Sequence, residues 1–349
     1  MTNEVEPTRP QLLLVVGAGR SGTSTVAGAL ARLGMSVPQP EVPADDSNPR
    51  GFYEPQWVVD FHEALLTGAG VRTNDVRPRA LELAQEHAAA ETAVVRLTEW
   101  LTSSTAAQDL VVKDPRTFWF HRLWRDSAAA AGLDIAFLTM LRHPAEVARS
   151  RETHYLVGQS AELRRARETA NVASWCHALL VTERATRGDR RAFVSYVDLM
   201  SDWRTALRHA DRSLGLGVTR DVTDAPHAID DFIDSSLHRS KVSWDEMSVH
   251  SVVRDLAEEL WSAAEGLVAD PEDGVVLDLL DDLHQRYDAL YGLASDLTMD
   301  QRTVDAAERR QQVRRLRQQV QRLECENARL AARPSQRARA WLARFRPRR

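Results

Sequence analysis

A glycine-rich segment separates two apolar stretches near the start of the chain. Gln11 to Val16 has the composition of a short buried strand, and Gly22 to Leu33 has the apolar spacing of a helix that ends at Gly34. Between them, residues 17–24 have the sequence Gly-Ala-Gly-Arg-Ser-Gly-Thr-Ser. Backbone N–H groups in such a loop, together with the following helix N-terminus, bind phosphate oxygens. The segment therefore predicts an anion site at the end of a strand.

The glycine spacing fits a dinucleotide-binding loop only in part. Gly17, Gly19 and Gly22 match the G-x-G-x-x-G pattern. A dinucleotide enzyme also needs a second strand and an acidic residue about 20 residues after the loop to bind the ribose. Here Val37 is followed by Pro-Gln-Pro, and Glu41 is a poor substitute for that acid. The pattern disfavours a dinucleotide cofactor.

The same segment has the frame of a nucleotide P-loop, but its cation is in another place. A nucleotide triphosphatase needs Lys after the last glycine to reach the β- and γ-phosphates. This chain has Thr23 there and carries Arg20 ahead of the helix. From that position Arg20 can address a group beyond a single 5′-phosphate.

Strands and helices alternate along the first 200 residues. Further strands are predicted at Leu110 to Lys113, Ile135 to Leu141 and Ala192 to Val197, and helices at 80–104, 117–131 and 160–187. This order predicts an α/β, three-layer, P-loop-like fold with a mostly parallel central sheet, followed by a C-terminal helical, coiled-coil extension. Ligands of such sheets bind at the carboxyl ends of the strands.

Five motifs in one order resemble those of the sulfotransferase family that uses 3′-phosphoadenosine 5′-phosphosulfate (PAPS). Arg20 ahead of Ser-Gly-Thr is similar to the family's 5′-phosphosulfate loop. Arg142 at a strand end, with Ser150 eight residues later, matches the motif that binds the 3′-phosphate. The other three motifs lie at Asn48 to Glu54 (Asn-Pro-x-Gly-x-x-Glu), Lys113 to Arg116 (Lys-Asp-Pro-Arg) and Tyr196 to Leu199 (Tyr-x-Asp-Leu). The resemblance covers about residues 11 to 200.

The chain departs from the family pattern at two places. Many cytosolic members have Lys where this chain has Arg20, although bacterial and carbohydrate-modifying relatives often have Arg. The late Arg-Lys-Gly element that helps to hold the 3′-phosphate is not present as such. The segment His238-Arg239-Ser240-Lys241 is a candidate to replace it.

The resemblance implies a sulfotransferase that moves a sulfuryl group from PAPS to a hydroxyl or amine of a small-molecule or carbohydrate acceptor. In-line displacement at sulfur needs cations and alignment, and it needs no metal in principle. Arg20 is expected to stabilise the bridging and sulfuryl oxygens. Donor contacts are expected from Gly19, Arg20, Ser21, Gly22, Thr23, Ser24, Arg142 and Ser150. The alternatives are a P-loop small-molecule kinase and a non-catalytic dimeric adaptor.

Glu54 is the expected catalytic base. It resembles the glutamate that carbohydrate and tyrosine sulfotransferases use from this region, and burial can raise the pKa of a carboxylate toward the working pH. His62, Asp114 and His121 are the alternatives for this role.

Lysine is rare in this chain, and one of its two lysines lies in a motif. Of the 45 basic residues, 43 are Arg, and only Lys113 and Lys241 are Lys. A retained Lys suggests that a compact ammonium is needed at its position. Lys113 could contact the sulfuryl group from its strand end, and Asp114 is expected to orient Arg20 or Lys113.

A heptad pattern begins at Val313. The a and d positions are occupied in turn by Val313, Leu316, Val320, Leu323, Asn327 and Leu330. This is a short coiled-coil pattern, and a single Asn at an a position favours a parallel dimer. The alternative is an amphipathic helix that folds back on the rest of the chain. We therefore predict a sulfotransferase domain at 1–298, a coiled-coil helix at 299–332 and a basic tail at 333–349.

Charge is distributed unevenly. Residues 301–349 carry 15 Arg and four acidic residues, a net charge of +11, so the first 300 residues carry −16 of the total of −5. The tail also holds Trp341, Leu342 and Phe345 and could contact an anionic membrane surface weakly, or could simply be solvated. No nucleic-acid partner is expected.

Composition predicts a cytoplasmic protein. No apolar run approaches the ~20 residues that a membrane span needs, and Leu12 to Val16 is too short for the core of a signal peptide. Cys176 and Cys325 are far apart and lack metal-site spacing, so neither a disulfide framework nor a zinc site is expected.

Overall fold

The computed structural model describes residues 9–46, 48–105, 108–152, 160–233 and 243–331. The chain divides into two compact units, Met1–Asp288 and Ala289–Arg349. The candidate replacement for the Arg-Lys-Gly element, His238 to Lys241, and the predicted basic tail with its membrane contact lie outside the described residues.

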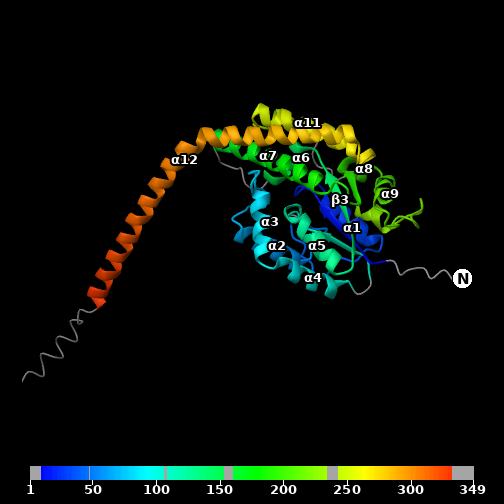
Figure 1. Cartoon of the computed structure of the whole chain (residues 1–349), viewed down its shortest axis with the longest axis horizontal. Coiled ribbons are helices and arrows are strands. Elements are labelled where there is room, and N and C mark those ends of the chain that lie inside the picture. The colour runs from blue at the N-terminus through cyan, green and yellow to red at the C-terminus, as the bar shows by residue number, and fades with distance from the viewer. Residues whose placement is uncertain (1–8, 47, 106–107, 153–159, 234–242, 332–349) are drawn as a thin grey trace, which may run out of the picture. The chain divides into compact units, whose positions relative to one another are not determined.

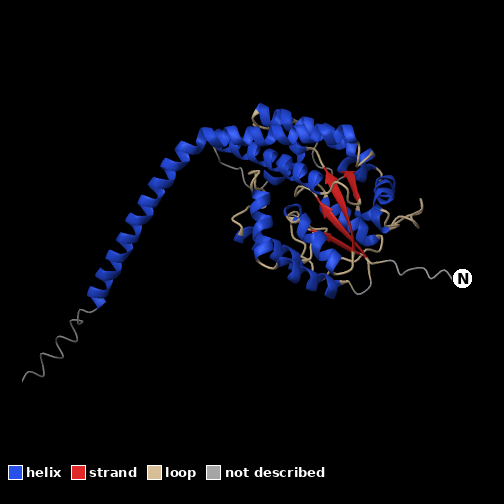
Figure 2. Ribbon diagram, in the orientation of Figure 1, coloured by secondary structure: helices blue, strands red, loops and turns tan. Residues whose placement is uncertain are grey.

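A four-stranded parallel sheet forms the centre of the first unit (Figure 2). The strand order is β2-β1-β3-β4, with β1 at Gln11–Val16, β2 at Leu110–Lys113, β3 at Asp134–Leu141 and β4 at Arg191–Ser195. Leu12, Leu13 and Leu14 are all completely buried, as expected for a parallel strand covered on both faces. The predicted α/β fold with a parallel central sheet is confirmed.

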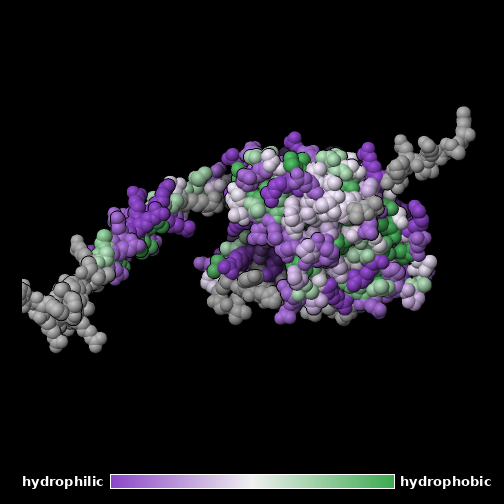
Figure 3. Space-filling model, turned by 90° about the horizontal axis from the view of Figure 1, so that it is seen from below, coloured by the Kyte–Doolittle hydropathy of each residue, from purple (hydrophilic) through white to green (hydrophobic). Residues whose placement is uncertain are grey.

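Helices cover both faces of the sheet (Figure 1). In chain order they are α1 (Thr23–Arg32), α2 (Gln56–Gly68), α3 (Ala80–Ala90), α4 (Ala93–Ser104), η1 (Thr117–Trp119), α5 (His121–Ala130), α6 (Pro144–Glu152), α7 (Ala161–Ala185), α8 (Tyr196–Ser201), α9 (Trp203–Leu214), α10 (Ala228–Phe232), η3 (Trp244–Glu246), α11 (Ser251–Ala269) and α12 (Gly274–Ala331). One core joins side chains of α1 and α9, such as Val26 and Leu207, to Leu13 and Leu138 of the sheet. Figure 3 shows one face of the molecule, where hydrophilic and hydrophobic residues are intermixed.

Two sequence predictions were wrong, one at the end of a strand and one inside a helix. The strand predicted to reach Val197 ends at Ser195, and Tyr196 opens α8. Tyr196 is buried beside the glycine loop, and this tertiary contact overrides its strand propensity. The helix predicted at 80–104 is two helices, because Thr92 adopts φ +52° between α3 and α4.

The last helix, α12, belongs to both units. Its first turns bury Leu280, Leu283 and Tyr287 in the first unit, where the Tyr287 hydroxyl donates a hydrogen bond to the Val76 carbonyl at 2.7 Å. The domain boundary predicted at residue 298 falls inside this helix and stays a prediction. In the part of the chain that the structure describes, no helix is both long and apolar enough to span a membrane.

Candidate active site

The glycine loop between β1 and α1 fits closely against two neighbouring elements. Gly17 has φ +133°, and a Cβ there would lie 2.8 Å from the Met140 carbonyl oxygen of β3. Gly22 has φ +93°, and a Cβ there would lie 2.3 Å from the Tyr196 ring. Arg20 also adopts a left-handed conformation, with φ +78°. The two glycines therefore allow the loop to approach β3 and α8 in a conformation that L side chains rarely adopt.

The N-terminus of α1 presents donors without a protein cap. Gly22 is its N-cap, no side chain caps the helix, and its first turn contains no acidic residue. The first N–H groups of any α-helix lack intrahelical acceptors, and the helix dipole favours an anion there. Ser21 is completely buried, and its hydroxyl has no hydrogen-bond partner among the described residues. This end of α1 is therefore suited to an anion.

Two motifs that are 130 residues apart in sequence meet beside this loop. Arg20 Nε donates a hydrogen bond to Ser150 Oγ at 3.0 Å, and Arg142 Nη1 donates one to the Arg20 carbonyl at 3.2 Å. Arg142 also pairs with Glu146, at 2.8 Å from Nε to Oε2, and stacks 4.4 Å above the Tyr196 ring. The structure thus brings the predicted residues Arg20, Arg142 and Ser150 together.

A second group of residues surrounds the predicted base. Glu54 forms an ion pair with Lys113, and both side chains are largely buried, at 11% and 3% exposure. Lys113 Nζ also donates to Ser24 Oγ at 3.1 Å. Asn48 Nδ2 approaches the same Ser24 oxygen at 3.3 Å and donates to the Gly51 carbonyl at 2.7 Å. Lys113 and Asn48 therefore link the segment that carries Glu54 to the first turn of α1.

The environment of Glu54 favours its protonated form more than water does. Burial raises the pKa of Glu54 above its ordinary value, and the charge of Asp114 adds to this effect. The ammonium of Lys113 acts in the opposite direction without cancelling the rise. A carboxylate with a raised pKa is better matched to proton transfer near neutral pH than an ordinary one.

The alternative base His62 has both ring nitrogens engaged inside the protein. Trp124 Nε1 lies 3.1 Å from His62 Nε2, and an indole N–H can only donate. His62 Nε2 is therefore the acceptor, and Nδ1 carries the proton directed at Asp114 Oδ2, 3.1 Å away. Both side chains of this pair are fully buried. His62 has no free nitrogen to accept a proton from an acceptor substrate.

The other two alternatives are also occupied or enclosed. Burial alone would raise the pKa of Asp114, but hydrogen bonds and charges from His62 and Arg116 lower it. The expectation that Asp114 orients Arg20 or Lys113 was wrong, because its carboxylate accepts hydrogen bonds from Arg116, at 2.8 Å from the backbone N, and pairs with His62. Burial, with the nearby charge of Arg125, lowers the pKa of the enclosed His121 to about 3.

Arg151 lies in the same region and was not predicted from the sequence. Its Nε donates to the Gly19 carbonyl at 3.3 Å, and its Nη1 donates to Ser174 Oγ at 2.7 Å and to the Asn171 carbonyl at 3.5 Å. Nothing in the sequence distinguishes this arginine from its neighbours on α6. In the described residues, no cluster of three or more His, Cys, Asp or Glu side chains could hold a metal ion.

Comparisons with known proteins found similar solved structures but no similar sequence family. No protein-family model and no curated protein matches it. The sulfotransferase domain of the olefin synthase of Synechococcus PCC 7002 is 17% identical, with a TM-score of 0.40, over 76% of this chain and 97% of that one. The sulfotransferase domain from the curacin biosynthetic pathway is 14% identical, with a TM-score of 0.38, over 72% and 98%. A sulfotransferase of Mycobacterium tuberculosis H37Rv is 18% identical, with a TM-score of 0.34, over 66% and 75%.

Proposed function

We propose that this chain is a sulfotransferase that moves a sulfuryl group from PAPS to a hydroxyl or amine of a small-molecule or carbohydrate acceptor. The main support is the hydrogen bond between Arg20 and Ser150, at 3.0 Å. It joins the loop that resembles a 5′-phosphosulfate site to the motif that resembles a 3′-phosphate site. A donor with phosphate groups on both sides of one ribose needs two such sites side by side.

The two sites bind different charged groups of the donor. In this proposal the N–H groups of the loop and of the first turn of α1 bind the 5′-phosphosulfate, aided by the hydroxyls of Ser21, Thr23 and Ser24. Arg142 and Ser150 bind the 3′-phosphate. Glu146 and the Tyr196 ring hold the Arg142 guanidinium in place before the donor arrives, so that little rotamer freedom is lost on binding.

Sulfuryl transfer then requires one bond to form and one to break at sulfur. The acceptor oxygen or nitrogen attacks the sulfur in line, the bond to the bridging oxygen breaks, and negative charge grows on the leaving 5′-phosphate. Arg20 and Lys113 are the cations positioned to stabilise that charge. Glu54 takes the proton that the acceptor loses. Its Oε1 contacts Lys113, and Oε2 has no hydrogen-bond partner among the described residues, so one oxygen can face the acceptor.

Calorimetry with adenosine 3′,5′-bisphosphate, ATP and NAD tests the donor class. We expect the bisphosphate to bind most tightly. Tight binding of ATP without binding of the bisphosphate would contradict the proposal and favour a kinase. Binding of none of the three would favour a non-catalytic adaptor.

Arg142→Ala tests the 3′-phosphate contact. We expect it to weaken bisphosphate binding by about 1.5–3 kcal/mol, the usual value of a hydrogen bond to a charged group. Arg165→Ala on the exposed face of α7 is the matched control. Equal affinities of the two variants would remove Arg142 from the site. A screen of acceptors with labelled donor would then identify the substrate.

A further inference from the structure

Arg151 lies beside the proposed donor site. Among the described residues, this cation has no acidic partner. It follows Ser150 on α6, and its hydrogen bonds in this part of the chain go to neutral oxygens, those of Gly19, Asn171 and Ser174. No described carboxylate lies within ion-pair distance of it. Its contacts connect the glycine loop to α7.

The positive charge of Arg151 adds to the positive charge of Arg20 in the glycine loop. Burial and the nearby charge of Arg20 lower the pKa of Arg151 to about 10, so the guanidinium is still charged at neutral pH. Of the three arginines in this region, Arg20, Arg142 and Arg151, only Arg142 has a carboxylate partner within the described ranges, Glu146. Two neighbouring cations without an acid repel each other, and an anion bound between them and the helix N-terminus relieves that repulsion.

We propose that Arg151 is a positioning residue for the phosphosulfate group of the donor. By donating to the Gly19 carbonyl it holds that oxygen toward α6, and this leaves the N–H groups that follow free to face the ligand. Its charge raises the affinity of the loop for a multiply charged anion without contacting the reacting atoms. The inference rests on the proposed function for the identity of that anion as a phosphosulfate.

Two substitutions separate the charge of Arg151 from its bridging contacts. Arg151→Gln removes the charge, and Arg151→Lys keeps the charge but loses the forked contacts. Arg165→Gln, at an exposed position of α7, is the control for the change in net charge. Binding of adenosine 3′,5′-bisphosphate and of inorganic pyrophosphate is measured by calorimetry over a range of salt concentrations.

We expect Arg151→Gln to raise the Kd of both ligands about tenfold and to reduce the salt dependence of binding. Arg151→Lys raises the Kd less and retains the salt dependence of the natural protein. Arg165→Gln changes neither quantity. A purely structural role would lower the affinity of both Arg151 variants alike and leave the salt dependence unchanged, and that result would overturn the proposal.

These measurements distinguish failure of the proposed function from failure of the positioning role of Arg151. If the natural protein binds pyrophosphate but not the bisphosphate, the proposed donor is wrong, and the role of Arg151 is read from pyrophosphate alone. If it binds neither ligand, both proposals fail. If Arg151→Gln does not fold, Arg151→Lys decides the question, because a Kd equal to that of the natural protein would contradict the positioning role.

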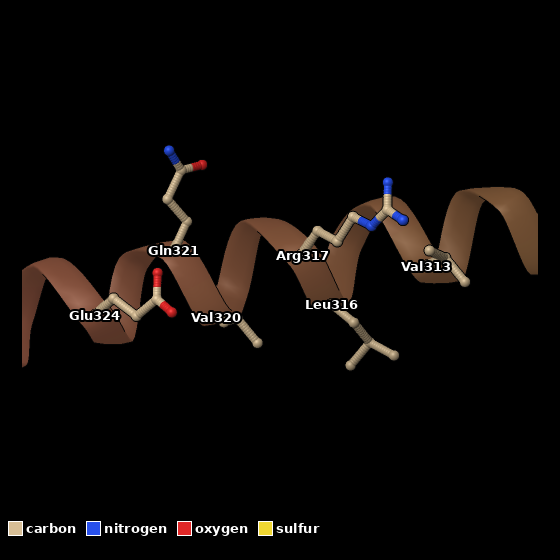
Figure 4. Close-up of a pocket in the computed structure, with 6 residues that line it drawn as sticks. All are labelled: Val313, Leu316, Arg317, Val320, Gln321 and Glu324. Carbon is tan, nitrogen blue, oxygen red and sulfur yellow. The ribbon is translucent and has the colours of Figure 1, made fainter.

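A separate observation concerns the second unit. In α12 the side chains of Val313, Leu316, Val320 and Leu323 are 47%, 53%, 53% and 51% exposed, although they follow the spacing of a coiled-coil seam. Figure 4 shows Leu316 and Val320 extending from the same side of the helix, and Arg317 and Gln321 from the other side. An apolar stripe with polar flanks is suited to a second helix of the same kind.

We infer that this stripe pairs with the same stripe of a second copy, with the two helices parallel. Asn327 occupies an a position, and in a parallel dimer the two Asn327 amides face each other and form a hydrogen bond. In an antiparallel pair each a position faces a d position, so the amide would face an apolar side chain and lose that partner. The parallel arrangement also places Gln312 near Arg317 and Gln319 near Glu324 of the second copy, with no pair of like charges.

Sedimentation of the full chain tests the dimer. We expect a concentration-dependent dimer that becomes a monomer in the variant Leu316→Glu with Leu323→Glu. Val304→Glu is the matched control, because Val304 is 46% exposed on the same helix but lies outside the seam. A natural protein that stays monomeric up to its solubility limit would overturn the inference.

Disulfide cross-linking tests the direction of the helices. Leu323→Cys in a Cys325→Ser background should form a cross-linked dimer, because d positions face each other in a parallel pair. The natural Cys325 lies at an f position, away from the seam, and should not cross-link. If the Leu323→Cys variant sediments as a dimer but forms no cross-link at this position, the helices are not parallel in this register.

Discussion

The ion pair between Glu54 and Lys113 combines a candidate base with a candidate electrophilic cation. If Glu54 is the base, it acts in its ionised form, so turnover rises with pH until Glu54 is fully ionised. Since burial raises its pKa above 4.5, the fall in rate on the acid side should begin at a higher pH than for an exposed glutamate. Glu54→Gln should lower turnover by about 10²–10⁴-fold and abolish that dependence on pH.

Steady-state rates over a range of pH, together with bisphosphate affinity, provide the measurement. Donor affinity should be nearly unchanged in Glu54→Gln. Glu63→Gln, an exposed position on α2, is the control. If turnover in Glu54→Gln equals that of the control, another residue is the base.

Removal of Lys113 should destabilise the fold in a manner that depends on pH. A group whose pKa is raised by folding stabilises the folded state below its unfolded pKa, and this contribution is lost as the pH rises through its folded pKa. Without its cation, Glu54 has a still higher pKa, so Lys113→Met should cost about 3–5 kcal/mol at neutral pH and less in acid. Urea unfolding at neutral and at acidic pH measures how the cost of Lys113→Met in the free energy of unfolding depends on pH.

The double variant Lys113→Met with Glu54→Gln provides the internal check. Because it leaves no buried charge from this pair, it should be more stable at neutral pH than Lys113→Met alone. Equal stability of the two variants would mean that the carboxylate is not the source of the cost.

Sequence patterns predicted which motifs meet at the glycine loop better than they predicted individual contacts. Arg20, Arg142 and Ser150 were found because each belongs to a motif with fixed spacing. The pairing of Lys113 with Glu54 joins positions 59 residues apart, and no local pattern encodes such a contact. The contacts of Arg151 were missed for the same reason, since they are made to the glycine loop and to α7.

At the scale of elements, the glycine loop depends on its fit against α8. In Gly22→Ala the residue would have to keep a φ of +93°, and its Cβ would lie 2.3 Å from the Tyr196 ring. We expect a loss of about 3 kcal/mol in the free energy of unfolding, from the backbone strain and the displaced ring. Binding of adenosine 3′,5′-bisphosphate should be lost as well.

Gly34→Ala separates the effect of backbone strain from the effect of contact with the Tyr196 ring. Gly34 has φ +102°, but a Cβ there meets nothing within 4 Å. This variant should lose only about 1–2 kcal/mol and should bind the bisphosphate normally. Equal effects at the two glycines would show that contact with Tyr196 is unimportant.

Buried strands were predicted more accurately than the ends of elements. The apolar runs at β1, β2 and β3 are unambiguous because both faces of each strand are covered. The end of β4 and the break at Thr92 are set by contacts of the folded chain, which the local sequence does not contain. Tyr196 shows this directly, since its ring packs on Gly22 from another part of the chain.

At the scale of the whole molecule, the parallel direction of the strands explains how motifs that are distant in sequence meet. Because every strand of the sheet runs in the same direction, the residues that follow β1, β2 and β3 lie at one edge. The loop at Arg20, the motif at Lys113 and the motif at Arg142 follow these three strands. This topology follows from the alternation of strands and helices, so the meeting of these motifs at one edge could be predicted before their detailed contacts.

The buried histidines should make the whole fold sensitive to acid. Burial lowers the pKa of His121 to about 3, and burial also lowers the pKa of His177. Stability from such a group is fully present above the unfolded pKa near 6.5 and is lost as the pH falls toward the folded value. Over that window His121 alone should lower the free energy of unfolding by up to about 1.4 kcal/mol per pH unit.

Urea unfolding from about pH 6 to about pH 4 measures this loss. His121→Leu should flatten the pH dependence by about one proton, while a weaker dependence from His177 remains. His250→Leu, at an exposed position, should leave the slope unchanged. A slope in His121→Leu as steep as in the natural protein would show that His121 gains no proton on unfolding, and that the acid sensitivity arises from other groups.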